Sequence, residues 1–492
     1  MADEKEQTHE VLQISEETVE SSSRESLPHV VQKNTEYQPI KSPSGVSVDA
    51  TSKRKTSKIL ILLAFLVVLA GVALVWLNKD LLFPSEPKQV TLTYWGLWET
   101  EQIMKPLIEE YQKEHPLVTI RYERHVSDQY RQRLQAAILR GEGPDIFRFH
   151  NTWVPELLQE LEPLPATVLS AQEYETLFYP VTKQDLFANG NYVGIPLEVD
   201  GLGLFYNEKT FQESGEIVPD TWDKLAEVAK KFTIKDRDGR IQTAGVALGL
   251  PTNVDHWSDI LGLMMLQAGV DMTNPSDEEA AKALLYFTQF ATTNPIWDET
   301  LPNSTVAFAE GKLAMYFGPS WRVFDIQELN PELEFNVAPV PQLPGTDEQS
   351  KVTWGRYWVE GVSRASENKE VAWDFLKFLT SKESEQKLYT QASQIRSFGP
   401  PYSRKDLSVL LSGEQYVGPF IDQAPYAQSW YMTSNTFDEG LNDQIVQYFE
   451  NAINTIVEKK TTDVPAVTEI LAEMTPGIQE VLRRYGLLAA PK

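Results

Sequence analysis

The longest apolar run of the chain lies between two polar stretches near the N-terminus. Residues Ile59–Leu77 read ILILLAFLVVLAGVALVWL and include no charged side chain. A helix needs roughly 20 apolar residues to cross a bilayer. Basic residues are denser before the run than after it, with Lys53, Arg54, Lys55 and Lys58 on one side and Lys79 and Lys88 on the other. Because basic residues favour the cytoplasmic side, we predict a single-pass cell-membrane anchor at 59–77, a cytoplasmic N-terminus and an extracellular remainder.

A cleaved signal peptide is the competing interpretation of this run. The preceding stretch is too long and too acidic for one, and no clear small-residue cleavage site follows. Residues 1–52 are rich in Ser, Glu, Thr and Gln and contain few large apolar side chains. Such a composition cannot bury enough apolar surface to fold, so we assign 1–58 to a disordered cytoplasmic tail. Residues 78–89, which include Pro84 and Pro87, predict a short linker.

From Val90 onward the apolar pattern switches repeatedly between the periods of strands and of helices. The segments VTLTYWG, VTIRYE and DIFRF have the alternation or the short apolar run of strands. Between them, ETEQIMKPLIEEYQKEHP and SDQYRQRLQAAILRGEGPD have helical spacing and end at Pro116 and Gly141. This order predicts right-handed crossovers and an α/β fold with a parallel sheet covered by helices. In such sheets, ligands bind at the carboxyl ends of the strands.

Residues suited to binding a sugar follow the ends of these and later strands. They are aromatic, acidic, amide or basic: Trp95, Glu99, His150, Asn151, Asp200, Trp321, Arg356 and Trp358. Flat aromatic rings cover the apolar face of a pyranose, while polar groups bind its hydroxyls. Core packing is the alternative role of each tryptophan, and we favour a cleft position for Trp95, Trp257, Trp321 and Trp358. The segment AFAEGKLAMYFGPSW poses this choice most directly, because Trp321 follows a buried strand and a Gly-Pro turn.

Composition excludes several classes of protein. A length of 492 residues predicts two or three folded units. The net charge of -26 argues against nucleic-acid binding, which needs a basic surface. The chain has no cysteine, which removes disulfides, thiolate metal sites and a lipid-modified cysteine. His150 has no histidine near it, and KDRDGR lacks the remaining ligands of a calcium loop, so we expect neither a metal nor a cofactor.

Four segments resemble, in the same order, the family 1 extracellular solute-binding proteins of ABC transporters, best known from the maltose-binding-protein-like sugar binders. The segments are PDIFRFHNTWVPELLQELEPL, GIPLEVDGLGLFYNEKTFQESGEIVPDTWDKLAEVAKKFT, AFAEGKLAMYFGPSW and WVEGVSRASENKEVAWDFLKFLTSKESEQKLY. The resemblance extends from about Val90 to the C-terminus. It implies the two-lobed, type II periplasmic-binding-protein-like fold, in which a hinge closes the lobes around a ligand in the cleft.

The resemblance also implies where the chain passes between the lobes, which we place near Asp200, near Ala338 and in the 380s. Each lobe then has two segments: 90–200 and 339–385 for lobe 1, and 201–338 and 386–492 for lobe 2. By position, the resemblance implies a pocket carboxylate, an aromatic platform, a lobe 1 loop and a last aromatic pair: Asp200, Trp321, His150–Trp153, and Trp430 with Tyr431. The segment WGRYW departs from the family's glycine-rich turn, so we expect Arg356 to project into the cleft.

The implied function is that of a membrane-anchored, monomeric substrate-binding component of an ABC importer, which is not an enzyme. Its ligand would be a carbohydrate, most simply an oligosaccharide, and its partners two permease subunits and an ATPase. Two alternatives stay open at this point. One is an anionic ligand, such as a phosphorylated polyol, held by Arg356. The other is a surface glycoside hydrolase that uses Glu198 and Asp200 as paired carboxylates.

Overall fold

The computed structural model describes residues 56–77, 88–433 and 439–489. The chain divides into two units, Met1–Ser85 and Glu86–Lys492. Nearly all of the predicted tail and of the predicted linker lies outside the described residues.

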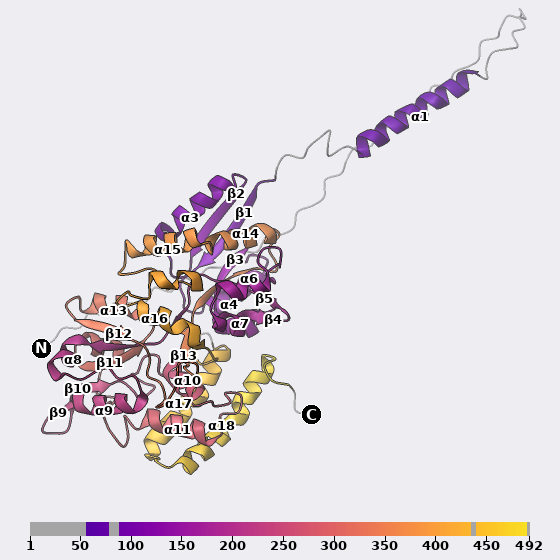
Figure 1. Ribbon diagram of the computed structural model, residues 1–492. Helices are drawn as coiled ribbons and strands as arrows, with labels where there is room; N and C mark the ends of the chain where they lie inside the picture. Colours follow the sequence, from indigo (N-terminus) through magenta and orange to yellow (C-terminus); the bar gives the residue numbers. More distant parts are fainter. Residues whose placement is uncertain (1–55, 78–87, 434–438, 490–492) are drawn as a thin grey trace, which may run out of the picture. The chain divides into compact units, whose positions relative to one another are not determined.

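In the first unit the structure describes helix α1, Thr56–Leu77 (Figure 1). Its described side chains are exposed and largely apolar, as at Leu62, Val67 and Trp76. Among the residues that the structure describes, no helix combines the length and the apolarity that a membrane span requires.

The first sheet of the second unit has five strands in the order β2-β1-β3-β14-β6. The strands are β1 Val90–Gly96, β2 Val118–Arg124, β3 Ile146–His150, β6 Ile195–Pro196 and β14 Trp358–Val362. Strand β1 pairs in parallel with β2 and β3, whereas β14 pairs antiparallel with β3 and β6. The three strands predicted at the start of this unit are thus confirmed, and so is their parallel pairing.

Helices pack on this sheet because their apolar positions recur at helical spacing. In α3, for example, Ile103, Leu107 and Tyr111 are buried along one face, and α3, α14 and α15 pack together (Figure 1). The helices of this part are α3 Glu101–Glu114, α4 Tyr130–Leu139, η1 Asn151–Trp153, α5 Val154–Leu157, α6 Ala171–Leu177, α7 Pro180–Leu186, α14 Lys369–Leu379 and α15 Lys382–Ser393. A short hairpin is formed by β4 Phe187–Ala188 and β5 Asn191–Tyr192.

The second sheet also has five strands, in the order β12-β8-β11-β10-β9. The strands are β8 Gly203–Asn207, β9 Ile234–Lys235, β10 Ile241–Val246, β11 Leu313–Gly318 and β12 Phe335–Ala338. Strand β11 is buried along its whole length, as its apolar sequence LAMYFG requires. It pairs in parallel with β10 and antiparallel with β8.

The helices around the second sheet include two long ones at the C-terminus that pack on each other. The helical segments are α8 Glu208–Ser214, α9 Trp222–Phe232, α10 Trp257–Gln267, α11 Glu278–Thr288, α12 Ser304–Ala309, α13 Arg322–Leu329, η2 Lys405–Leu410, α16 Gly418–Gln423, α17 Leu441–Lys459 and α18 Val464–Arg484. The short η3, Ala424–Tyr426, follows α16 and packs against α7. Helix α18 packs against both α11 and α17.

Two separate hydrophobic cores lie under the two sheets, and we call the parts built around them lobe 1 and lobe 2. The lobe 1 core draws mainly on 92–199 and 357–392, and the lobe 2 core on 202–354 and 398–482. The sequence placed the middle crossing near Ala338, whereas core membership changes between Trp354 and Tyr357. The reason is that the Trp354 ring lies against Gly262 of lobe 2, while Tyr357 donates a hydrogen bond to Asp185 of lobe 1.

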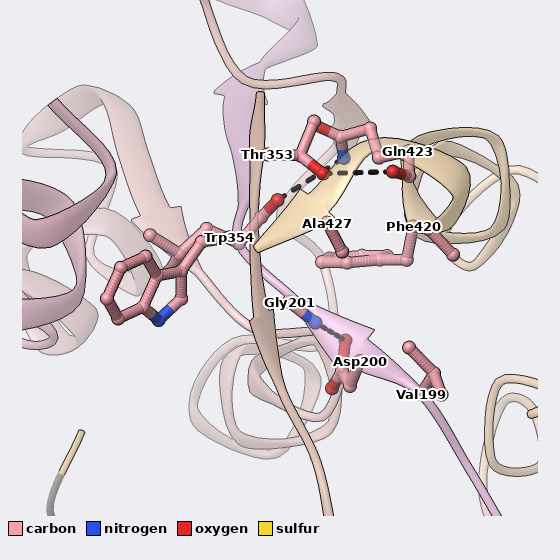
Figure 2. Close-up of a pocket in the computed structure, with 10 residues that line it drawn as sticks. Val199, Asp200, Gly201, Thr353, Trp354, Phe420, Gln423 and Ala427 are labelled. Atoms are coloured by element: carbon pink, nitrogen blue, oxygen red, sulfur yellow. Dashed lines mark hydrogen bonds between the residues drawn. The ribbon is translucent and has the colours of Figure 1, made fainter. Parts of the chain in front are cut away.

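A small three-stranded sheet forms where the chain passes between the two cores. In it, β13 Thr353–Arg356 pairs antiparallel with β7 Asp200–Gly201 and parallel with β15 Ala427–Gln428. Figure 2 shows the residues of these strands that line a small pocket. Its volume is about 10 Å³, roughly what one water molecule occupies. A Cβ atom at Gly201 would lie 2.0 Å from the carbonyl oxygen of Trp354, so this close approach of the strands requires glycine.

Candidate functional site

Aromatic rings gather at the ends of β1, β3 and β14 in lobe 1. Trp358 is central, with its ring edge-on to those of Trp98, His150 and Trp153 at centroid distances of 5.4, 5.1 and 5.3 Å. The antiparallel pairing places Trp358 directly opposite His150. Trp98 is 40% exposed and therefore presents this cluster to solvent. Trp95 lies outside it and packs on the His125 ring instead, with the ring centroids 4.1 Å apart.

A buried ion network supports this cluster. The guanidinium of Arg148 binds the carboxylates of Glu99 and Glu360, with a distance of 2.6 Å from its Nη2 to Glu360 Oε1. Tyr94 donates a further hydrogen bond of 2.6 Å to the same oxygen of Glu360. Glu99 is only 2% exposed, so its carboxylate is an internal partner of Arg148, and its predicted role in ligand binding stays a prediction.

In lobe 2, Trp321 follows the end of β11 and immediately precedes helix α13. It is 37% exposed, unlike the fully buried Trp297, Trp354 and Trp373. Three side chains lie against its ring. The guanidinium carbons of Arg322 and Arg356 are 4.4 and 6.0 Å from the ring centroid, and the His256 ring stands nearly perpendicular at 5.7 Å. The ring that the sequence selected as a platform is therefore exposed and rests on fixed side chains.

His256 connects the two arginines behind Trp321. Arg322 Nε lies 3.0 Å from His256 Nε2, and Arg356 Nη1 lies 2.8 Å from His256 Nδ1. Arg356 is also paired with Asp259 at 3.4 Å and is only 5% exposed. Burial tends to raise the pKa of Asp259, but the Arg356 guanidinium and the contact with His256 lower it to about 2. Arg356 is thus buried and already paired with His256 and Asp259, and its projection into the cleft stays a prediction.

Asp200 lies in β7 and determines the shape of the turn before the platform. Its carboxylate accepts hydrogen bonds from the amide and the hydroxyl of Ser320, at 3.2 and 2.8 Å, and from the amide of Gly201 at 2.8 Å. Burial raises the pKa of Asp200 to about 6, against the effect of these donors. Asp200 therefore holds the residue immediately before Trp321, a positioning role that the sequence did not reveal.

Asn151 is buried and contacts an acidic residue that sequence reasoning missed. Its amide nitrogen donates to Asp185 Oδ2 at 2.8 Å, and the Tyr357 hydroxyl donates to the same oxygen at 2.8 Å. The hydroxyl of Ser429 donates to the other oxygen of Asp185. Asp185 thus connects α7 and η1 with the segments that follow β13 and β15. Asn151 contributes to this hydrogen-bond network and so helps to hold these segments together.

Asp185 should make the stability of the protein depend on pH. Burial raises its pKa to about 6, despite the three donors around it. A carboxyl whose pKa is raised on folding contributes stability at low pH, and this contribution disappears as the pH rises through the folded pKa. In urea unfolding, Asp185→Asn should therefore gain about 1–3 kcal/mol relative to the native protein between pH 4 and pH 8. Parallel pH profiles of the two proteins would contradict this.

The remaining predicted residues occupy the lobe 2 side. Trp257 begins α10 and is half-buried against the lobe 2 core. Trp430 and Tyr431 are half-buried neighbours whose ring centroids are 4.9 Å apart. The indole nitrogen of Trp430 is buried without a hydrogen-bond partner among the described residues. The binding roles of these residues, and of Trp95, stay predictions.

The clusters of the two lobes lie within electrostatic reach of each other. Burial and, as the second contribution, the charge of the Arg356 guanidinium lower the pKa of His150 to about 3. The His150 ring is therefore neutral, and it lies near the arginine that supports the platform. Sequence reasoning missed His256 and Asp259, although their spacing of one helical turn was a usable signal. In the described part of the chain, no three His, Asp or Glu side chains converge as metal ligands.

The sequence of this chain is similar to a family of binding proteins and to several of its members. A family model described as bacterial extracellular solute-binding protein matches residues 106–403. The maltotriose-binding protein of Pyrococcus abyssi is 24% identical over 295 residues, which cover 57% of this chain and 60% of that relative. The multiple sugar-binding protein of Streptococcus mutans is 22% identical over 353 residues, which cover 66% of this chain and 79% of that relative. The chain thus spans less than two thirds of the length of the first of these relatives.

Solved structures share the two-lobed α/β fold. A cyclo/maltodextrin-binding protein complexed with maltotetraose superposes with a TM-score of 0.65 at 19% identity, covering 81% of this chain and 99% of that one. The sugar-binding protein MalE of Xanthomonas citri superposes with a TM-score of 0.64 at 19% identity, covering 81% of this chain and 100% of that one. These similarities confirm the predicted fold of two α/β lobes.

Proposed function

Because this chain belongs to the bacterial extracellular solute-binding proteins, we propose that it is the carbohydrate-binding component of an ABC importer. In this proposal the two lobes close around an oligosaccharide and deliver it to two permease subunits powered by an ATPase. The family comprises binding proteins, so the chain is not an enzyme and the glycoside-hydrolase alternative is set aside. The names of the Pyrococcus and Streptococcus relatives, which refer to maltotriose and to multiple sugars, favour a sugar ligand.

The observation that carries the proposal is the exposed Trp321 ring on its fixed support. An indole that is 37% exposed and held by Arg322, Arg356 and His256 offers one rigid apolar surface. A pyranose presents a matching apolar face of C–H groups. In lobe 1, the 40% exposed ring of Trp98, which packs on Trp358, adds a second such surface. Two aromatic surfaces, one from each lobe, suit a ligand of more than one sugar unit.

The alternative of an anionic ligand held by Arg356 is disfavoured. Its guanidinium is 5% exposed and already contacts His256 and Asp259. A phosphate would have to displace Asp259 from this pair, and removing one partner of a buried pair is costly. Neutral sugars should therefore bind more tightly than their phosphorylated counterparts.

Membrane attachment through α1 is part of the same proposal. The run 59–77 has no charged residue and follows a basic stretch, and the described side chains of α1 are exposed and largely apolar. The described chain after it would then be the extracellular, monomeric binding unit. Retention of the full chain in the membrane pellet after a carbonate wash tests this, and release into the supernatant would contradict it.

Isothermal titration of the full chain in lipid nanodiscs tests the sugar proposal. The panel should include maltose, maltotriose, maltotetraose and mannobiose, with maltose 6-phosphate as the anionic member. We expect at least one neutral oligosaccharide to bind in the micromolar range or tighter, corresponding to about -8 kcal/mol or better. Heat from the phosphorylated sugar alone would favour the anionic alternative, and silence across the panel would contradict carbohydrate binding.

A further inference from the structure

Helix α17 of lobe 2 begins with a cap that lobe 1 provides. The first amides of a helix have no partners within the helix, and the preceding residue usually supplies one through its side chain. Here that residue is Gly440, which has no side chain to offer. Instead, the amide of Leu441 donates a hydrogen bond of 2.9 Å to Oε1 of Glu156, in α5 of lobe 1.

Glu156 is well placed for this contact. Its side chain is 1% exposed and is paired with Arg131 of α4, with 3.3 Å between Arg131 Nη2 and Glu156 Oε1. A carboxylate is favourable at the start of a helix, because the helix dipole is positive there. The burial of the pair protects this attraction from screening by salt. Glu156 is thus fixed in lobe 1 by Arg131 and directed at the first turn of α17.

The next residue of α17 makes a second contact between the lobes. Asn442 Nδ2 donates to Thr152 Oγ1 at 2.9 Å, and Thr152 Oγ1 lies 2.8 Å from Nδ1 of His150. The Thr152 amide also donates to this ring nitrogen at 3.4 Å. Nδ1 of the neutral ring is therefore the acceptor, and Nε2 carries the proton. The chain of contacts ends at His150, a predicted ligand-binding residue, and leaves its Nε2 as a hydrogen-bond donor.

We propose that Glu156 and Asn442 form an interlobe latch, a pair of contacts made only in the closed conformation. The proposal rests on the proposed function, in which the hinge closes the lobes around a sugar. Leu441 belongs to the lobe 2 core, and Glu156 and Thr152 flank Trp153 and Leu157 of the lobe 1 core. A hinge opening that separates the cores breaks both hydrogen bonds. The latch residues contact no ligand; they set affinity by setting the population of the closed form.

Removing the latch should shift the conformational equilibrium without unfolding either lobe. Asn442→Ala removes one contact, and Glu156→Gln neutralises the cap of α17. Each variant should raise the Kd for the sugar and its dissociation rate roughly 3- to 10-fold, within the usual range of coupling between sites. Gln447→Ala is the matched control, because Gln447 lies in the same helix and is exposed. Its Kd should equal that of the native protein.

The closed population can be measured directly, because the chain has no cysteine of its own. Spin labels at Leu139→Cys in lobe 1 and Ile217→Cys in lobe 2 occupy sites that are 82% and 85% exposed. Double electron–electron resonance on the full chain in nanodiscs, with and without saturating maltotriose, gives the distribution of distances between the two spin labels. In Asn442→Ala, and also in Glu156→Gln, the fraction of closed molecules should fall, and the population with the longer distance between the labels should rise.

Two results would overturn the latch. One is a closed fraction that stays the same in Asn442→Ala as in the native protein. The other is the absence of a closed population from every sample. Because Asn442→Ala leaves the buried Arg131–Glu156 pair intact, its result does not depend on how well Glu156→Gln folds. If no sugar binds but the ligand-free variants open, the latch stands and the proposed function fails.

Discussion

Trp321→Ala should weaken oligosaccharide binding by roughly 30- to 160-fold, the equivalent of about 2–3 kcal/mol for an aromatic residue that dominates an interface. The reason is that the exposed indole would be lost while its support remains. Arg322, His256 and Arg356 would keep their mutual contacts, so the fold around the turn should persist. Isothermal titration with the tightest sugar of the panel measures the effect.

A matched variant separates stacking from folding. Trp321→Phe keeps an aromatic face of smaller area, so its Kd should lie between those of the native protein and Trp321→Ala. The unfolding temperatures of both variants should stay close to the native value, because the ring is 37% exposed and lies outside the core. An unchanged Kd in Trp321→Ala would show that this ring is only a surface residue.

Arg148→Met should lower the free energy of unfolding by about 3–5 kcal/mol, because it leaves two buried carboxylates without their shared cation. Glu99 and Glu360 are 2% and 0% exposed, so water cannot replace the guanidinium. Burial already raises the pKa of Glu360 in the native protein, against the opposing charge of Arg148. Removing that charge raises this pKa further, so the variant should recover stability as the pH falls from 7 to 5. Urea unfolding at the two pH values measures both effects.

The whole network can be removed as a control. A triple variant, Glu99→Gln, Arg148→Met and Glu360→Gln, removes the charges of all three paired residues. It should regain much of the stability lost in the single variant, because replacing a complete buried ion network is often close to neutral. A loss of less than about 1 kcal/mol in the free energy of unfolding of Arg148→Met would contradict the prediction, because the two carboxylates would then not depend on Arg148 for their stability.

Much of the fold could be predicted because its signals are local. Strands β1, β2 and β3 follow alternation or a short apolar run, and α3 follows helical spacing, so a window of a few residues is enough. The sequence put the middle crossing near Ala338, whereas core membership changes within one short segment, between Trp354 and Tyr357. The side chain of Trp354 lies against lobe 2 and that of Tyr357 contacts lobe 1. No periodic pattern marks such a change.

The candidate site was predicted in its types of residue but not in its pairings. Trp321 is exposed as expected, since a Gly-Pro turn after a buried strand is a local feature. Arg356 and Glu99 are instead bound to internal partners that lie far away in the sequence. Arg356 is 97 positions from Asp259, and Asp185, which the sequence did not single out, is 172 positions from Tyr357. Such partners are known only once the chain has folded.

The bonds between Asp200 and Ser320 have a consequence for redesigning the specificity of this protein. Asp200 belongs to the first strand that joins the lobes, and it fixes the residue before the platform. The side chain at position 321 can therefore be changed by itself, because residues 318–320 of the turn are buried and residue 321 is exposed. The hydrogen bonds between Ser320 and Asp200, in contrast, couple the position of Trp321 to any rotation of strand β7. A change of ligand specificity should therefore be sought by substituting residue 321 while Asp200 and Ser320 are kept.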